Sequence, residues 1–113
     1  MSMTEQLDQE DVKLFTLARG AAARIQASEG AAVRDETGRT YSSAAVTLGG
    51  RTWSALDLAV VQAAAAGARG LEAAVVVTDR GAIDVDVVSA LAGVGVPIYL
   101  CSTSGSTTAV LRS

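Results

Sequence analysis

The sequence predicts a single α/β domain, spanning residues 1–113, in which helices cover one sheet. Segments with apolar residues at helical spacing alternate with short β-branched segments, as expected for strands joined by helical crossovers. Half of the residues are apolar, which suffices for a buried core at this length. No internal repeat or linker divides the chain. We therefore expect one domain with parallel pairing after each crossover and a flexible segment at residues 1–7.

The first half of the chain predicts a helix followed by a β-hairpin. Apolar residues recur at helical spacing from about residue 8 to residue 27, although Gly20 costs about 1 kcal/mol relative to alanine there. The period changes to two at residues 30–47, with a short glycine-containing loop at 36–38. Gly49 and Gly50 are then expected to break the second strand.

The second half predicts two more helices, each followed by a strand. Ser54 and Asp57 have the spacing of a capping box, in which the serine oxygen accepts from the Asp57 N–H and a carboxylate reaches back. This helix is expected to end near Gly67 or Gly70. The remaining expected elements are a buried strand at 71–78, a loop at 79–81, a helix within 83–92, a strand at 97–101 and a short strand at 108–111.

The composition argues against nucleic acid and membranes as partners. The formal net charge is −3 and the basic residues are scattered, so nucleic acid is not an expected partner. No apolar run is long enough to span a membrane, and the acidic start of the chain does not resemble a signal peptide. A single cysteine, Cys101, forms no internal disulfide. We therefore expect a cytoplasmic protein without a membrane partner.

A conventional catalytic zinc site is excluded by the side chains available. Such sites hold the metal with three histidine, cysteine or carboxylate ligands and leave one position open for water. The chain contains no histidine and one cysteine. The sequence therefore predicts no metal and no cofactor.

Several segments resemble the small cytidine deaminases. Those enzymes have a Gly-Ala-Ala-Leu strand, an Asp-Gly-Arg turn, a helix that opens with Cys-Ala-Glu, and a late Pro-Val-Tyr-Leu strand. The matching segments are Gly30-Ala31-Ala32-Val33, Asp35 with Gly38-Arg39-Thr40-Tyr41, the helix from Ser54 with residues 63–67 behind it, and Val96-Pro97-Ile98-Tyr99-Leu100. The resemblance extends from about residue 11 to residue 104. It implies a three-layer α/β/α fold with a mixed sheet of about five strands and helices on both faces.

The resemblance also indicates which positions match the family's metal ligands and substrate contacts, and most of them carry a different type of residue here. The first metal thiolate falls on Ala55, and the proton-shuttling carboxylate falls on Asp57. The second metal motif falls within Thr78–Asp86, a segment without cysteine whose nearest remnants are Asp79, Gly81 and Asp84. The ribose contacts fall on Ala45 and Thr47 within 44–47, and the base-packing aromatic falls near Ala27. No catalytic residue is therefore assigned.

Several polar side chains have two interpretations. Asp57 either caps its helix or is a relic carboxylate with a new task. Asp79, Asp84 and Asp86 either belong to a solvated loop and helix start, or gather a hard cation such as Mg²⁺. Cys101 either packs in a strand or is a redox-sensitive nucleophile.

Two further features bear on packing and assembly. Trp53 precedes the capping serine and is either a hydrophobic staple or an exposed contact residue. Residues 63–66 are all alanine, which is typical of a closely packed helix face. Because the family assembles dimers or tetramers through helices that border its active sites, the resemblance places this face at a subunit interface.

The function predicted from these observations is that of a catalytically inactive cytidine deaminase-like protein, a homo-oligomeric binding or interaction module. Two alternatives stay open. One is an active nucleoside deaminase of the family with an atypical site that uses Asp57. The other is a module that binds a nucleoside or nucleotide without converting it.

Overall fold

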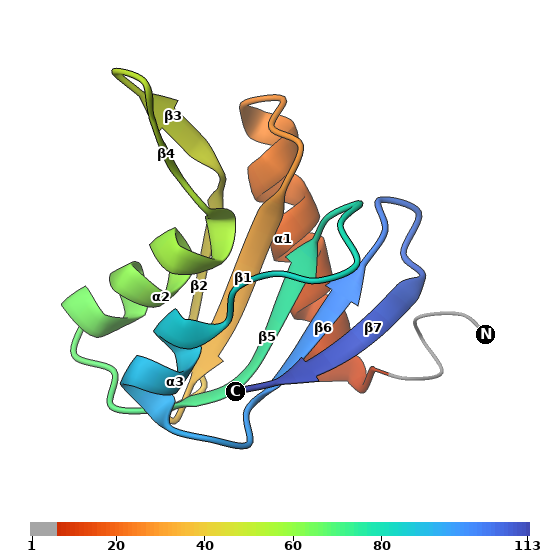
Figure 1. Ribbon diagram of the computed structural model, residues 1–113. Coiled ribbons are helices and arrows are strands. Elements are labelled where there is room, and N and C mark those ends of the chain that lie inside the picture. The colour runs from red at the N-terminus through yellow and green to blue at the C-terminus, as the bar shows by residue number, and fades with distance from the viewer. Residues whose placement is uncertain (1–6) are drawn as a thin grey trace.

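The computed structural model describes residues 7–113 and has three layers (Figure 1). A mixed five-stranded sheet with the order β2-β1-β5-β6-β7 carries α1 on one face and α2 and α3 on the other. The three-layer α/β/α prediction is therefore confirmed. Of the segment expected to be flexible, residues 1–6 lie outside the described part, while Leu7 is buried against the α1 side of the core.

Helix α1 (Gln9–Arg24) lies directly against the sheet. It begins after Asp8, whose carboxylate accepts a hydrogen bond of 2.8 Å from the Asp11 N–H. A Cβ added to Gly30, the first residue of the adjacent strand, would lie 2.0 Å from the Ala18 carbonyl oxygen. Glycine at this position thus allows the helix to approach the strand.

The first hairpin, of β1 (Gly30–Asp35) and β2 (Thr40–Ala44), forms as predicted. The carboxylate of Asp35 holds its turn, accepting hydrogen bonds from the backbone N–H and hydroxyl of Thr37, from the Arg39 N–H and from the Tyr41 hydroxyl. Burial alone would raise the pKa of Asp35, but these donors outweigh burial and lower it. The turn is therefore fixed by an ionised carboxylate.

The expectation that Gly49 and Gly50 simply break the strand was wrong. They form the turn of a second hairpin, between β3 (Val46–Leu48) and β4 (Arg51–Trp53), which makes a two-stranded sheet of its own. Both glycines have positive φ, 58° and 80°, as a tight two-residue hairpin turn requires. The hairpin projects away from the main sheet (Figure 1).

Helix α2 (Ala55–Ala65) begins where the capping pattern predicts. The Ser54 hydroxyl oxygen accepts from the Asp57 N–H at 3.0 Å. Within residues 7–113, the Ser54 N–H does not donate the return bond to the Asp57 carboxylate, so only the serine half of the box is present. The helix is followed by Gly67, with φ of 95°, as predicted.

The remaining elements complete the sheet and refine two predictions. Strand β5 pairs with β6 in parallel, as predicted, but with β1 in antiparallel fashion, because β1 lies between β5 and its parallel crossover partner β2. The last helix begins at Asp86, within the predicted range 83–92, and the side chains of Ile83 and Val85 pack against the core from the preceding loop. These elements are β5 (Leu71–Val77), α3 (Asp86–Ala92), β6 (Pro97–Cys101) and β7 (Thr107–Arg112).

Strand β5 divides the core between the two faces. Ala73, Val75 and Val77 face α1, whereas Ala74 and Val76 face α2 and α3. Both sets are buried, which explains why β5 is a continuous apolar segment rather than an alternating one. Within residues 7–113, no helix is both long and apolar enough to cross a lipid bilayer.

Candidate functional site

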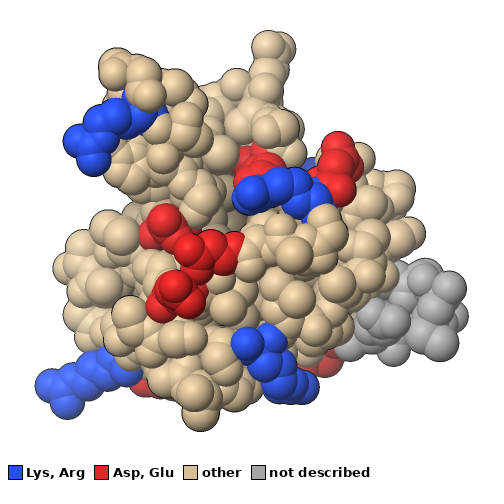
Figure 2. All heavy atoms as spheres, viewed as in Figure 1, with Lys and Arg blue, Asp and Glu red and all other residues tan. Residues whose placement is uncertain are grey.

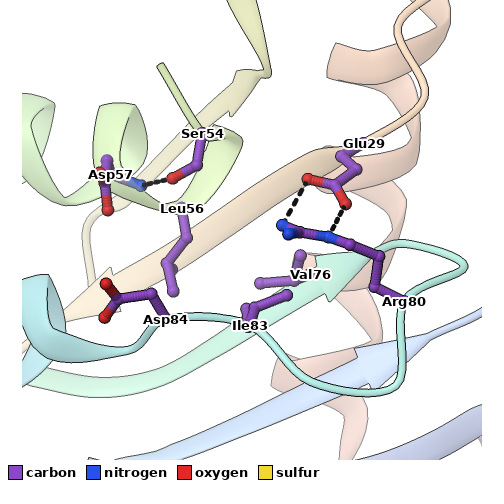
Figure 3. Close-up of a pocket in the computed structure, with 8 residues that line it drawn as sticks. All are labelled: Glu29, Ser54, Leu56, Asp57, Val76, Arg80, Ile83 and Asp84. Carbon is purple, nitrogen blue, oxygen red and sulfur yellow. Dashed lines mark hydrogen bonds and ion pairs between the residues drawn. The ribbon is translucent and has the colours of Figure 1, made fainter. Parts of the chain in front are cut away.

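A pocket of about 180 Å³ lies on the α2 and α3 face, where the start of α2 meets the loop that follows β5 (Figure 3). Its lining combines the loop before β1, the first turn of α2, the end of β5 and the loop before α3. The lining residues are Glu29, Ser54, Leu56, Asp57, Val76, Arg80, Ile83 and Asp84.

The pocket has two polar sides separated by an apolar middle. Figure 3 shows Leu56, Val76 and Ile83 lying between the carboxylates of Asp57 and Asp84 on one side and Glu29 with Arg80 on the other. Figure 2 shows the same face of the molecule, with acidic side chains gathered over α3 and a basic side chain flanked by acidic ones over the loop that follows β5.

Glu29 and Arg80 form a bidentate ion pair. The Arg80 Nε–H donates to Glu29 Oε2 at 2.8 Å, and a second guanidinium N–H donates to Oε1 at 3.2 Å. The Thr78 hydroxyl also donates to Oε2, at 2.6 Å. Burial alone would raise the pKa of Glu29, but Thr78 and Arg80 outweigh burial and lower it. Arg80 therefore faces an ionised partner within the pocket.

Zinc, which the fold family implies, does not fit the donors present. At the first metal position Ala55 offers a buried methyl group, and the segment Thr78–Asp86 contains neither histidine nor cysteine. Cys101 is fully buried in the core on the opposite face of the sheet, against α1, and burial raises the pKa of its thiol. In the described part of the chain, no group of three or more histidine, cysteine, aspartate or glutamate residues is placed to hold a metal ion.

The structure brings together some of the residues singled out from the sequence and separates others. Asp57 and Asp84 line the pocket, but Asp79 and Asp86 do not. The positions that match the family's base and ribose contacts, Ala27, Ala45 and Thr47, are also absent from the lining. Trp53 instead lies in β4, with the guanidinium carbon of Arg51 at 5.0 Å from the centre of its ring.

Sequence reasoning missed Glu29 and Arg80. They lie 51 positions apart, so no local pattern connects them. The only available signals were indirect: Glu29 directly precedes the Gly-Ala-Ala strand, and Arg80 lies inside the segment that matches the second metal motif.

The surface between α2 and α3 is lined by apolar side chains. A groove of about 260 Å³ runs between the two helices. Ala63, at the start of the alanine segment, is buried, but Ala64 to Ala66 are exposed, and Val61 is 55% exposed. The groove is lined by Val60, Val61, Ala64, Val87, Ala90 and Leu91.

The three-layer fold is that of a deaminase-type α/β domain. The chain is similar to the crystal structure of cytidine deaminase from Burkholderia pseudomallei, with a TM-score of 0.65 and 24% sequence identity over 88% of this chain and 90% of that chain. At this identity the likeness establishes the fold. The family model described as cytidine deaminase-like matches residues 7–105. The chain therefore belongs to the cytidine deaminase-like family. No curated protein sequence matches it.

Proposed function

We propose that this chain is a cytidine deaminase-like protein without hydrolytic activity, acting as a homo-oligomeric binding or interaction module. One observation carries the first part: the pocket at the family's catalytic position has no set of metal donors. Hydrolytic deamination needs a hydroxide near neutral pH, and zinc supplies it by lowering the pKa of bound water to about 7. With a methyl group at Ala55 and no thiolate or imidazole nearby, the pocket cannot hold that zinc.

Asp57 does not restore the reaction by itself. A carboxylate at this position can accept a proton, but it does not generate the nucleophile that attacks the base. The positions that match the family's base and ribose contacts, Ala27, Ala45 and Thr47, do not line the pocket, whose volume with Arg80 paired to Glu29 is about 180 Å³, which argues against a nucleoside-binding module. The retained carboxylate is therefore assigned to the start of α2, where the positive end of the helix dipole stabilises it.

The apolar groove between α2 and α3 supports the interaction role. Asp57 and Gln62 are the only polar side chains of α2, so this helix is apolar on nearly every side. A helix of that kind is normally buried, yet Val61 and Ala64 lie at the surface of the single chain. We propose that a second copy of the chain covers this groove in a dimer or tetramer. The proposed location is the cytoplasm, where the Cys101 thiol stays reduced.

Cytidine turnover tests the catalytic part. Purified protein supplied with excess zinc is incubated with cytidine, and uridine is measured by chromatography against a reaction without protein. We expect no uridine above that background. Uridine formation that is abolished by a zinc chelator would overturn the proposal.

Light scattering after size-exclusion chromatography tests the assembly. The wild-type chain is expected to elute as a dimer or tetramer at micromolar concentration, and Val61→Glu to elute as a monomer because a charge in the groove would be buried unpaired. Val110→Glu is the matched control, since Val110 is 45% exposed on β7 outside the groove. A monomeric wild-type chain, or equal dissociation by both variants, would contradict the proposed surface.

A further inference from the structure

The loop that follows β5 forms one wall of the pocket. Residues 79–84 lie outside any helix or strand, and this loop supplies three of the eight lining residues, Arg80, Ile83 and Asp84. Ile83 lines the pocket and packs against the core. Figure 3 shows the loop passing along the pocket with the Arg80 side chain turned back toward Glu29. The size of the pocket thus depends on where this loop lies.

The start of this loop is attached to the domain by a small network of hydrogen bonds around the Glu29 carboxylate. The Thr78 hydroxyl donates to Glu29 and accepts the Arg80 N–H at 3.1 Å, while the Arg80 guanidinium makes the bidentate pair with the same carboxylate. Bidentate geometry is the condition under which an ion pair near the surface contributes measurably. Thr78 is buried, and only 14% of the Glu29 side chain is exposed. The Glu29 carboxylate is therefore largely buried and is also held by Thr78, directly after β5.

The Arg80 side chain is exposed enough to move away from Glu29. The Arg80 side chain is 58% exposed, and Gly81 and Ala82, which follow it, are exposed as well. Among the described residues, the Glu29 pair is the only salt bridge made by this loop. When the Arg80 guanidinium leaves Glu29, the hydrogen bond from the Arg80 N–H to the Thr78 hydroxyl and the packing of Ile83 and Val85 still hold the loop.

We propose that residues 79–84 are a strap that closes the pocket and is held shut by the Arg80–Glu29 ion pair. Opening the strap removes Arg80, Ile83 and Asp84 from the lining and exposes Leu56 and Val76 beside Asp57. The pocket then widens and gains an unpaired carboxylate at Glu29. This inference is independent of catalysis and of oligomeric state.

Trypsin cleavage tests the strap directly, because Arg80 must leave Glu29 before the protease can bind it. Proteases report local opening when reclosing is fast. Arg69 is the internal control, since it lies in another exposed loop and its side chain makes no ion pair among the described residues. The measurement is the ratio of initial cleavage rates after Arg80 and after Arg69, followed by mass spectrometry.

In Glu29→Gln we expect this ratio to rise about threefold to fivefold, the change that a partly exposed pair of up to about 1 kcal/mol produces. Arg80→Lys keeps the cleavage site but loses the bidentate contact, so a smaller rise is expected. An unchanged ratio in Glu29→Gln would overturn the proposal. Equal acceleration at both sites would also overturn it, because the pair would then hold the whole domain rather than the strap.

The wild-type protein provides a second test that does not depend on any variant folding. Raising NaCl from about 0.05 M to about 1 M shortens the screening length several-fold and weakens an exposed pair. The ratio is expected to rise with salt in the wild-type chain and to stay flat in Glu29→Gln. If the ratio of cleavage rates in the wild-type chain did not change with salt, the Arg80–Glu29 ion pair would not be what holds the strap closed.

Discussion

The two faces of the sheet are built differently. On the α1 face the helix approaches β1 so closely that Gly30 has no room for a side chain, and the core there includes the fully buried Cys101. On the other face α2 and α3 leave the pocket beside Asp57 and an apolar groove around Val61. The α1 face is therefore closely packed at Gly30, and the other face carries the pocket beside Asp57 and the apolar groove.

The close packing of α1 and the positions that match the family's catalytic residues lie on opposite faces of the sheet. The α1 face keeps the small residues that allow close approach, so the three-layer architecture survives. The pocket face keeps the helix start at Ser54 and the carboxylate of Asp57 but has alanine where a thiolate would be. The packing of α1 does not depend on Ala55 or on segment 78–86, because neither belongs to the core cluster on that face.

The largest effect is expected on the packed face, from Gly30→Ala. Its Cβ would lie 2.0 Å from the Ala18 carbonyl oxygen, which is backbone and cannot move aside cheaply. We expect a loss of about 3 kcal/mol in the free energy of unfolding, measured by urea denaturation. Gly20→Ala in α1 is the control: nothing lies within 4 Å of the added Cβ, so a gain of about 1 kcal/mol is expected. If Gly30→Ala left the free energy of unfolding unchanged, α1 would not be packed closely against β1.

A smaller effect is expected on the pocket face from Ser54→Ala. The substitution leaves the Asp57 N–H without its acceptor and costs about 1 kcal/mol of unfolding free energy. The control is Ser89→Ala inside α3, where the hydroxyl makes no hydrogen bond among the described residues and the change is expected to stay within about 0.5 kcal/mol. If Ser54→Ala also left the free energy of unfolding within about 0.5 kcal/mol, the Ser54 cap would not stabilise the start of α2.

The smallest effect is a difference in pH response between the two faces. The pKa of Glu29 is lowered, so its stabilisation is complete above the unfolded value of 4.5 and is lost as pH falls through the lower folded value. The pKa of Asp11 on α1 is raised, chiefly by burial, despite its contact with Arg34 at 3.0 Å. Its ionisation therefore costs stability above the folded pKa, and that cost disappears as pH falls toward 3.8.

Carboxyl titration by NMR distinguishes the two groups. Glu29 is expected to titrate below 4.5 and Asp11 above 3.8, and Glu29→Gln should remove the part of the acid destabilisation that arises at the pocket. Titration of Glu29 at or above 4.5 would mean that the pair with Arg80 does not persist in solution.

Most of the fold could be predicted from the sequence because its signals are local. Helical spacing located α1, and the Ser54 cap located the start of α2. The second hairpin was missed because β3 and β4 have three residues each, too few to show a period, and its Gly49-Gly50 turn was taken for a strand break. Helix α3 lies within the predicted range 83–92, but its first residue could not be located there, because the apolar side chains of Ile83 and Val85 pack against the core from the loop before it.

The candidate site could be predicted only in part. The resemblance placed Ala55, Asp57 and segment 78–86 near one another, and the pocket contains Asp57 together with residues of that segment. The Glu29–Arg80 pair could not be found, because it depends on how the loop after β5 folds back onto the residue before β1. Charge pairing across 51 residues leaves no trace in composition or spacing.

The central claim, that this member of the family cannot hold the metal that deamination requires, is tested most directly by elemental analysis. Protein produced in zinc-supplemented medium and passed through a desalting column is analysed for zinc per chain by mass spectrometry. We expect far less than one zinc per chain, with no increase after incubation with added zinc. About one tightly held zinc per chain would contradict the account.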